Sequence, residues 1–224
     1  RKWEEIHYAV CGQCKRFHWG YSASDVPAVC TCGNSLTESR NTDLKGKFII
    51  PQQGFVAANE TTSPGENPPQ RTYASRIYFT EYRSPLTKAV EERDLEPDPD
   101  LANSQVRVYK AISPHGWMAL VNDGYGRGFD ICESCGWSQV VDFSQNAQKR
   151  FGKHKNPFSQ KDCSGKTHSY HLGHRYMTNV LELKFEGIRF EQAEMLSTLY
   201  AILDGASEEL GIRRDDIDGT LFYR

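Results

Sequence analysis

The chain has 224 residues, of which 38% are hydrophobic and 25% are charged, and its formal net charge is −2. This length suffices for one large domain or two small ones with a modest core. There is no run of 18 apolar residues and no signal-peptide core near the start, which argues against a membrane span and favours a cytoplasmic protein. The first residue is Arg rather than Met, which predicts a piece of a longer protein.

Cysteine is the most informative residue type in this sequence. Six of the seven cysteines form three close pairs, and without a secretion signal their thiols are expected to stay reduced. Close pairs of reduced thiols are typical of metal ligands, and zinc is the metal most often bound by thiolate and imidazole groups. The sequence therefore predicts zinc sites rather than disulfides.

Residues 1–45 are predicted to form a zinc ribbon. A short strand-like segment leads into Cys11 and Cys14, and a loop connects them to Cys30 and Cys32. The spacing is C-x2-C-x15-C-x-C, so the second pair is one residue tighter than the usual CxxC. Four thiolates leave no open coordination position, and we expect this site to be structural.

Residues 46–126 are predicted to be a β-rich connecting region with exposed loops. Polar residues with Pro and Gly at 59–70, and the acidic segment 91–104, predict two of these loops. Strands are expected at 46–57, 76–83, 105–112 and 117–123, the last two being paired through a turn at 113–116. A hairpin turn is expected at Gly124, Gly126 and Gly128, because these residues do not match the phosphate-binding pattern GxGxxG.

The C-terminal region is predicted to contain the clearest helix. A half-buried strand is expected at 178–187, a helix at 190–211 that Gly211 ends, and a further strand from residue 217. Apolar residues recur every three or four positions along the helix and predict a core-packing stripe: Met195, Leu196, Leu199, Ile202, Leu203, Ala206 and Leu210. The predicted class is α+β, with a strand-rich body, a zinc ribbon, a second Cys3His zinc module and a long C-terminal helix.

The second zinc site is predicted around the pair Cys132 and Cys135. Cys163 is the one cysteine left, so the fourth ligand should be a histidine. His154 is favoured, because it lies in a loop that can close back on Cys163 nine residues later. His168, His171 and His174 remain alternatives, although the last two are more typical of strand packing.

Two catalytic readings of the same region are disfavoured. The SGKT at 164–167 imitates the end of a phosphate-binding loop, but Gln160 stands where that pattern requires glycine. Cys163 and His168 resemble a nucleophile and its base, but a zinc-bound thiolate is not available for attack. A zinc hydrolase would need an open coordination position and a carboxylate base, for which Glu133 and Asp162 are only sequence neighbours of cysteines.

Basic residues are concentrated between residues 145 and 175. This stretch has seven Lys or Arg against one acid, whereas residues 91–100 carry six acids against one Arg. Such polarity is compatible with a phosphate-facing side and a solvated or partner-facing side. The candidate DNA-backbone contacts are Lys149, Arg150, Lys153, Lys155, Lys166 and Arg175. Interleaved aromatic residues that could stack on bases, or simply pack, are Phe151, Phe158, Tyr170 and Tyr176.

The segments "FDICESCGW", "HKNPFSQKDC" and "YHLGHRYMTNVLELKFEG", followed by the long helix, resemble a known module. It is the MrfA-type zinc-binding (MZB) domain, which is found at the C-terminus of superfamily 2 DNA helicases and in DrmB, the partner of the DrmA helicase in the bacterial DISARM antiviral defence system. The resemblance covers residues 127–224, and residues 1–80 look like the region that precedes the module. It implies that Cys132, Cys135 and Cys163 bind zinc, and it favours His154 as the fourth ligand.

The resemblance implies an accessory role, because the chain has no complete Walker A motif and no DExH box. We expect a non-catalytic zinc-binding subunit or domain that binds DNA without sequence specificity and supports a helicase motor, either DrmA-like in trans or in cis, in phage defence or DNA repair. The alternatives are a protein-interaction scaffold without DNA contact and, more remotely, a zinc hydrolase. Members usually continue beyond the helix, so the module is expected to be truncated at residue 224.

Overall fold

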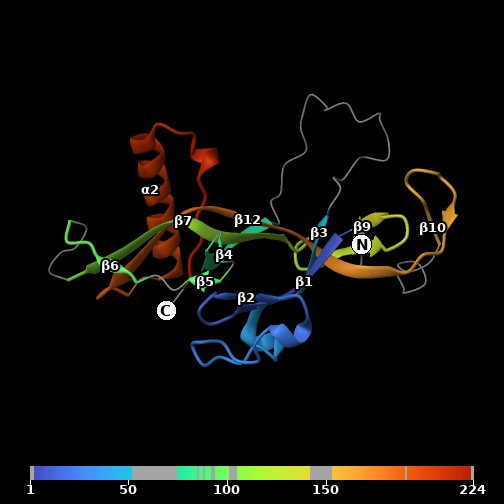
Figure 1. The fold of residues 1–224 in the computed structure, drawn as a ribbon, viewed down its shortest axis with the longest axis horizontal. Helices are drawn as coiled ribbons and strands as arrows, with labels where there is room; N and C mark the ends of the chain where they lie inside the picture. Colours follow the sequence, from blue (N-terminus) through green and yellow to red (C-terminus); the bar gives the residue numbers. More distant parts are fainter. Residues whose placement is uncertain are drawn as a thin grey trace.

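The computed structural model describes residues 3–51, 75–84, 86–87, 89–91, 94–100, 105–141, 153–189 and 191–222. Within these ranges the chain is strand-rich and has one α-helix, which agrees with the predicted α+β class (Figure 1). The strands are β1 (Trp3–Cys11), β2 (Phe17–Gly20), β3 (Thr42–Pro51), β4 (Ser75–Arg83), β5 (Val90–Glu91), β6 (Glu96–Pro97), β7 (Arg107–Asn122), β8 (Phe129–Cys132), β9 (Ser138–Val140), β10 (His154–Lys155), β11 (Asp162–Cys163) and β12 (Thr167–Glu186). The helix is α2 (Gln192–Leu210), and three short 3-10 turns are η1 (Ala23–Asp25), η2 (Ser39–Asn41) and η3 (Arg214–Asp216).

One large sheet organises the fold. Its strand order is β2-β1-β3-β12-β7-β4-β5, with β6 added to β7, and β8 and β9 added to β12. The β3–β12 pair is parallel and the other pairs are antiparallel. β10 and β11 form a separate two-stranded hairpin.

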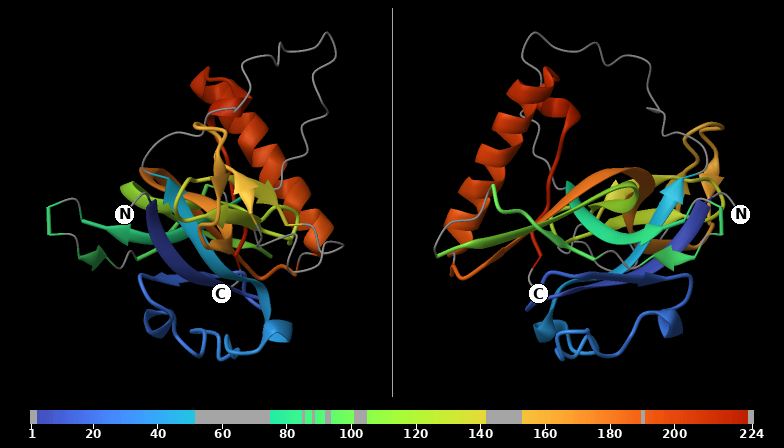
Figure 2. Two further views of the ribbon diagram at one scale, coloured as in Figure 1. Left: turned by 90° about the vertical axis from the view of Figure 1, so that its right-hand side faces the viewer. Right: turned by 60° about the vertical axis from the view of Figure 1, so that its left-hand side comes forward.

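The sheet curves until strands from distant positions in its order meet. Phe17 of β2 stacks on Tyr78 of β4 with ring centroids 5.2 Å apart. The core enclosed by this curvature consists of Ile6, Tyr8, Val10, Phe17, Phe48, Tyr78, Ala119 and Val121. In both views of Figure 2 the blue N-terminal region and the red helix α2 lie on opposite sides of the green and orange strands.

The predicted turn at residues 113–116 is wrong. β7 runs through it as one strand of 16 residues, and a β-bulge opposite Thr178 and Val180 absorbs the irregularity. The fully buried Ser113 accepts a hydrogen bond from the backbone N–H of His115 at 3.1 Å. A polar residue that suggested a turn therefore bonds to a backbone N–H of the bulge instead. The strands expected at 105–112 and 117–123 therefore form a single strand along β12.

Gly124, Gly126 and Gly128 do form a turn, with φ of 59°, 76° and 78°. It is not a hairpin turn, because the flanking strands β7 and β8 both pair with β12 at different positions rather than with each other. β12 is long enough to do this: residues 167–170 pair with β8, and residues 172–186 pair with β7. This strand thus carries the metal-binding segments at one end and the core at its centre.

Helix α2 matches the predicted range, and Gly211 ends it in the left-handed conformation at φ 62°. The expected core stripe is only partly buried. Leu203 is 9% exposed, whereas Leu196 and Leu210 are 40% and 66% exposed. The helix packs partly on the segment that follows it, where Gly219 lies against Leu199, so residues 217–222 form a covering segment and not the predicted strand.

The strand predicted at 76–83 is confirmed as β4, and the strand predicted at 178–187 is the second half of β12. β3 ends at Pro51, while residues 52–57 of that prediction and the loop at 59–70 lie outside the described residues. Within the acidic segment, β6 joins the sheet and Asp98 is buried against Lys110 at 2.6 Å.

The predicted regions 1–45, 46–126 and 127–224 contribute strands to the same sheet, and β3 crosses the first boundary. They therefore do not fold as three separate sheets. Among the described helices, none has the length and apolar character needed to cross a membrane.

Candidate metal centres

The first candidate centre is formed by Cys11, Cys14, Cys30 and Cys32. Their sulfur atoms all lie within 4.8 Å of one another. Sγ of Cys11 is 3.7 Å from Sγ of Cys32, and Sγ of Cys14 is 3.4 Å from Sγ of Cys30. Three of the four residues are buried and Cys32 is exposed. The sequence-predicted set is thus brought together in space at the end of β1.

Tight backbone turns hold these sulfurs in position. The N–H of Cys11 bonds to the carbonyl of Arg16 at 3.0 Å, and the N–H of Lys15 bonds back to the carbonyl of Cys11 at 2.9 Å. Lys15 takes φ of 60° to close this turn. Gly33, at φ 88°, bonds to the carbonyl of Cys30 and closes the second turn in the same manner.

The second candidate centre is formed by Cys132, Cys135, His154 and Cys163, whose donor atoms also lie within 4.8 Å of one another. Sγ of Cys132 is 3.9 Å from Sγ of Cys163, and Sγ of Cys135 is 3.1 Å from Nε2 of His154. His154 and Cys163 are paired opposite each other in the β10–β11 hairpin. The hairpin register therefore presents both donors together.

The knuckle at Cys132 repeats the geometry of the knuckle at Cys11. The N–H of Cys132 bonds to the carbonyl of Trp137, and the N–H of Gly136, at φ 74°, bonds back to the carbonyl of Cys132, both at 2.9 Å. The Trp137 ring stacks on His154 with centroids 4.7 Å apart, which fixes the imidazole plane. Two unrelated stretches of sequence thus build the same CxxC turn.

The other three histidines are engaged elsewhere. Nε2 of His168 is 3.0 Å from a carboxylate oxygen of Glu133, and Nδ1 of His171 is 2.5 Å from the Tyr8 hydroxyl. His174 stacks on Tyr176. The structure places His154 at the sulfur cluster and none of the alternatives that the sequence left open.

Both donor sets fit a tetrahedral ion. Metal–sulfur bonds of about 2.3 Å at tetrahedral angles separate two sulfurs by roughly 3.8 Å, and a sulfur from an imidazole nitrogen by roughly 3.6 Å. The separations of 3.4–3.9 Å between sulfurs agree with the first value, and the 3.1 Å between Cys135 and His154 is shorter than the second by about 0.5 Å. Two metal ions can therefore be held, each by four protein donors.

Hydrogen bonds lower the pKa of one cysteine in each centre. Burial opposes ionisation of Cys11, but bonds from the Cys14 N–H and the Asn34 amide outweigh it and lower the pKa to about 6. At Cys132 burial is likewise outweighed by N–H groups of the knuckle, and the pKa falls to about 7. Because the thiolate is the form that binds metal, Cys11 and Cys132 are the cysteines most easily ionised for metal binding in their centres.

The second cysteine of each CxxC turn has a raised pKa. Burial raises the pKa of Cys14 to about 12 and the pKa of Cys135 to about 11. These thiols would lose their protons on metal binding, so metal affinity should rise with pH.

His18 adds a contact that the sequence did not reveal, since its Nε2 lies 3.2 Å from Sγ of Cys30.

The described residues among the predicted DNA contacts differ in exposure. Lys153, Lys155 and Lys166 are exposed near the second centre, although Lys155 is also paired with Asp162 at 2.6 Å. Lys149 and Arg150 lie outside the described residues. Sequence reasoning did not single out Lys161, which is exposed on the same hairpin and could have been found from its place in the basic run.

Arg175 was predicted to contact DNA, but the structure places its side chain among strands rather than in solvent. Its side chain is only 9% exposed, with Cζ 3.4 Å from the ring centroid of Trp19 and 5.2 Å from that of Trp117. Glu81 lies 3.8 Å from the guanidinium. The guanidinium thus packs between strands, and its burial disfavours the predicted phosphate contact.

The interleaved aromatic residues also differ from one another. Tyr170 is 4% exposed and packs in the core, and Tyr176 is half-buried against His174. Phe151 lies outside the described residues. Phe158 is 76% exposed, so it is the one of the three described rings that is presented to solvent.

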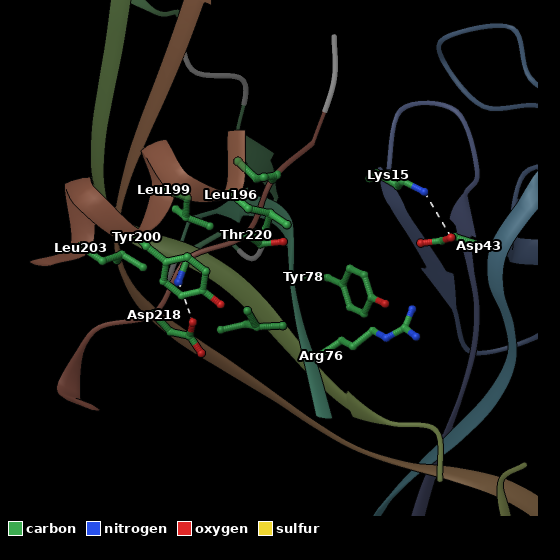
Figure 3. Close-up of a pocket in the computed structure, with 13 residues that line it drawn as sticks. Lys15, Asp43, Arg76, Tyr78, Leu196, Leu199, Tyr200, Leu203, Asp218 and Thr220 are labelled. Carbon is green, nitrogen blue, oxygen red and sulfur yellow. Dashed lines mark hydrogen bonds and ion pairs between the residues drawn. The ribbon is translucent and has the colours of Figure 1, made fainter. Parts of the chain in front are cut away.

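A cavity of about 270 Å³ lies between α2 and β4 (Figure 3). Leu196, Leu199 and Leu203 line its apolar side, and Arg76 and Lys15 lie on its polar side. Each of these cations has a carboxylate partner, Asp123 at 3.9 Å and Asp43 at 3.2 Å. Asp218 is a further charged residue of the lining, and its carboxylate accepts the N–H of Gly219 at 2.7 Å.

Comparison with known proteins finds no family model, no curated protein and no solved structure that matches this chain.

Proposed function

We propose that this chain is a non-catalytic zinc-binding module that contacts the DNA backbone through the hairpin beside its second metal centre, and that it serves as an accessory part of a DNA helicase. The observation that carries the proposal is the placement of exposed lysines on a hairpin whose two strands each supply a ligand, His154 and Cys163. The helicase partner and a role in phage defence or repair rest on the resemblance of residues 127–224 to the MZB module.

Zinc is the proposed metal because both sites combine thiolates with imidazole or further thiolates at tetrahedral spacing. Four protein donors fill the coordination sphere of zinc, which supports a structural role and disfavours the hydrolase alternative. When bound, the ions would fix the two CxxC knuckles and the base of the β10–β11 hairpin. The chemistry expected of this chain is binding rather than catalysis.

The lysines around the hairpin supply the proposed DNA contacts. Lys153, Lys155, Lys161 and Lys166 are exposed; the acidic neighbours are Asp162, which pairs with Lys155 at 2.6 Å, and Glu133, whose N–H bonds to the carbonyl of Lys166. Phosphate contacts of this kind give affinity without sequence choice and release counterions, so binding weakens as salt rises. With three to four lysines engaged, we expect a log–log salt slope of about −2 to −3 on single strands.

The test is the affinity of the protein for a labelled oligonucleotide, measured by anisotropy between 50 and 200 mM salt. Affinity should fall roughly 20- to 50-fold over this range. Lys153→Gln and Lys166→Gln should each make the slope shallower by about 0.7. The matched control is Arg213→Gln, which removes the same charge from a side chain that is 78% exposed near the end of α2. An unchanged affinity across salt, or no binding, would refute the DNA-binding function.

A protein-interaction scaffold is the second candidate, supported by an exposed apolar cluster on the β7–β12 ribbon. Ile112 and Leu181 are paired across these strands and are 70% and 55% exposed, and Met177 is 44% exposed on the same strand. Exposed apolar groups that gather in this way often mark an interface. A helicase partner whose binding is lost in Leu181→Glu, with no DNA binding by this chain, would favour the scaffold over the DNA-binding module.

A further inference from the structure

Phe158 is exposed at the tip of the β10–β11 hairpin, far from the hydrophobic core. Its side chain is 76% exposed, although full burial of a Phe side chain is worth about 1.5–3 kcal/mol. Figure 1 shows the hairpin projecting from the end of the molecule opposite to α2. A large ring in this position contributes nothing visible to folding.

The turn that carries the ring is internally fixed. Asn156 is its hub: its side-chain oxygen accepts the N–H of Phe158 at 2.9 Å and that of Ser159 at 3.1 Å, and its carbonyl accepts the N–H of Gln160 at 2.9 Å. The N–H of Asn156 donates to the carbonyl of Lys161 at 2.9 Å. Pro157 adds a fixed φ. The backbone that carries the ring is therefore held in one conformation, which lowers the entropy cost of binding through this turn.

The base of the hairpin is anchored by the second metal centre. His154 and Cys163 are register partners at the base, four and five residues from Phe158. Trp137 stacks on His154 from the knuckle side. The turn, the two short strands and the metal ligands thus form a short rigid finger, defined here as residues 154–163.

Basic residues flank the turn that carries this ring. Lys155 and Lys161 lie on either side of the turn and Lys153 precedes the finger, all three exposed, while Asp162 is the one acid within the finger and pairs with Lys155 at 2.6 Å. The complementary ligand is a flat apolar group attached to an anionic chain. An unpaired nucleobase on its phosphate backbone has this chemistry. An anionic membrane is less suitable, because one ring buries little apolar surface in a bilayer.

We propose that Phe158 stacks on an unpaired base of single-stranded DNA while the finger lysines contact the adjoining phosphates. The inference rests on the proposed DNA-binding function and adds to it a preference for single strands over duplex, in which the bases already stack on one another. Base–aromatic stacking is worth about 1–3 kcal/mol per base, so loss of the ring should weaken binding roughly 5- to 150-fold.

The experiment measures anisotropy of the whole chain with three probes: a single-stranded 20-mer, the same strand with abasic sites, and the matching duplex. Phe158→Ala should weaken binding to the 20-mer by the stated factor without changing the salt slope, and Phe158→Trp should restore it. The wild type should bind the abasic strand as weakly as Phe158→Ala does. Tyr21→Ala is the matched control, because Tyr21 is 63% exposed and lies on the first metal region.

The outcomes separate the two proposals. Salt-dependent binding that is equal for wild type and Phe158→Ala, or equal for intact and abasic strands, would overturn the stacking inference and leave the DNA-binding function standing. No binding to any of the three probes would remove the function itself. Phe158-dependent binding to phosphatidylserine vesicles, with none to the 20-mer, would assign the finger to membranes and overturn the inference. Phe158→Ala should keep the metal content and circular dichroism of the wild type, because the ring is exposed.

Discussion

Replacement of Arg175 by Met tests whether the buried guanidinium stabilises the curved sheet. Arg175 lies on β12 and stacks on Trp19 of β2 and Trp117 of β7, so it joins strands that are not neighbours in the sheet. Met retains much of the aliphatic volume and removes the charge. The stability change therefore reports the charge and its stacking rather than a cavity.

Two effects of opposite sign set the magnitude. Burial lowers the pKa of Arg175, which shows that the charged form is disfavoured by desolvation. Against this, a desolvated cation–π contact contributes about 2 kcal/mol, and the nearer ring lies at 3.4 Å. Because relief of the desolvation offsets part of the lost contact, we expect Arg175→Met to lose up to about 2 kcal/mol of unfolding free energy, which corresponds to at most roughly 4–8 °C in Tm for a chain of this size.

Trp19→Leu should cost more than Arg175→Met, about 3–5 kcal/mol, because it removes the ring and leaves the charge buried with less compensation. The double variant should then cost less than the sum of the two single variants, with a coupling energy of about 1–2 kcal/mol.

Urea denaturation followed by circular dichroism gives the three free energies, and Arg213→Met at an exposed position is the control, expected within about 0.5 kcal/mol of wild type. Strict additivity of the two substitutions would refute the stacking account. A shallower DNA salt slope in Arg175→Met would show that the guanidinium reaches phosphate after all.

Three further predictions concern the metals, the packing and the pH response. Elemental analysis should find two zinc ions per wild-type chain, and one per chain in Cys135→Ser and in Cys14→Ser. A second ion retained in either variant would contradict the assigned ligands. Gly173→Ala should destabilise the protein by about 1–3 kcal/mol, because its Cβ would lie 2.1 Å from Cδ2 of the buried Phe48 ring. Gly205→Ala on α2 should stabilise it by up to about 1 kcal/mol, because a Cβ there meets nothing within 4 Å. Equal effects of the two variants in a melting assay would refute the packing argument. Burial lowers the pKa of His171, so its contribution to stability is present above the unfolded value of about 6.5 and is lost as pH falls below it. Unfolding free energy should therefore drop by up to about 1.2 kcal/mol more between pH 7 and 5.5 in wild type than in His171→Gln, and identical profiles would exclude this role.

Local signals in the sequence were sufficient for the metal-binding residues. A CxxC turn is a local structure, in which two sulfurs are fixed by hydrogen bonds within six residues, so the pairs at Cys11 and Cys132 could be recognised without the fold. The same holds for helix α2, whose range follows from apolar periodicity and a glycine stop. The choice of His154 followed from loop length and from the family resemblance, and the structure places that residue at the cluster.

Long-range pairing decided what local signals could not. The polar residues at 113–116 suggested a turn, but residues 172–186 of β12 pair with β7 on both sides of this point, so a bulge replaces the chain reversal. Arg175 was predicted to contact phosphate because the sequence shows the charge of a side chain but not whether that side chain faces solvent. Trp117 reaches it from the neighbouring strand β7, but only the curvature of the sheet brings Trp19 of β2 to it.

The sequence by itself determined which side chains can bind metal and where the basic run lies, because ligand type, spacing and charge are properties of nearby residues. The tertiary structure decided which basic and aromatic residues face solvent. Burial depends on strands far apart in the chain, so Arg175 and Tyr170 are buried in the sheet, while Phe158 is exposed in the turn of a finger whose base holds two candidate metal ligands.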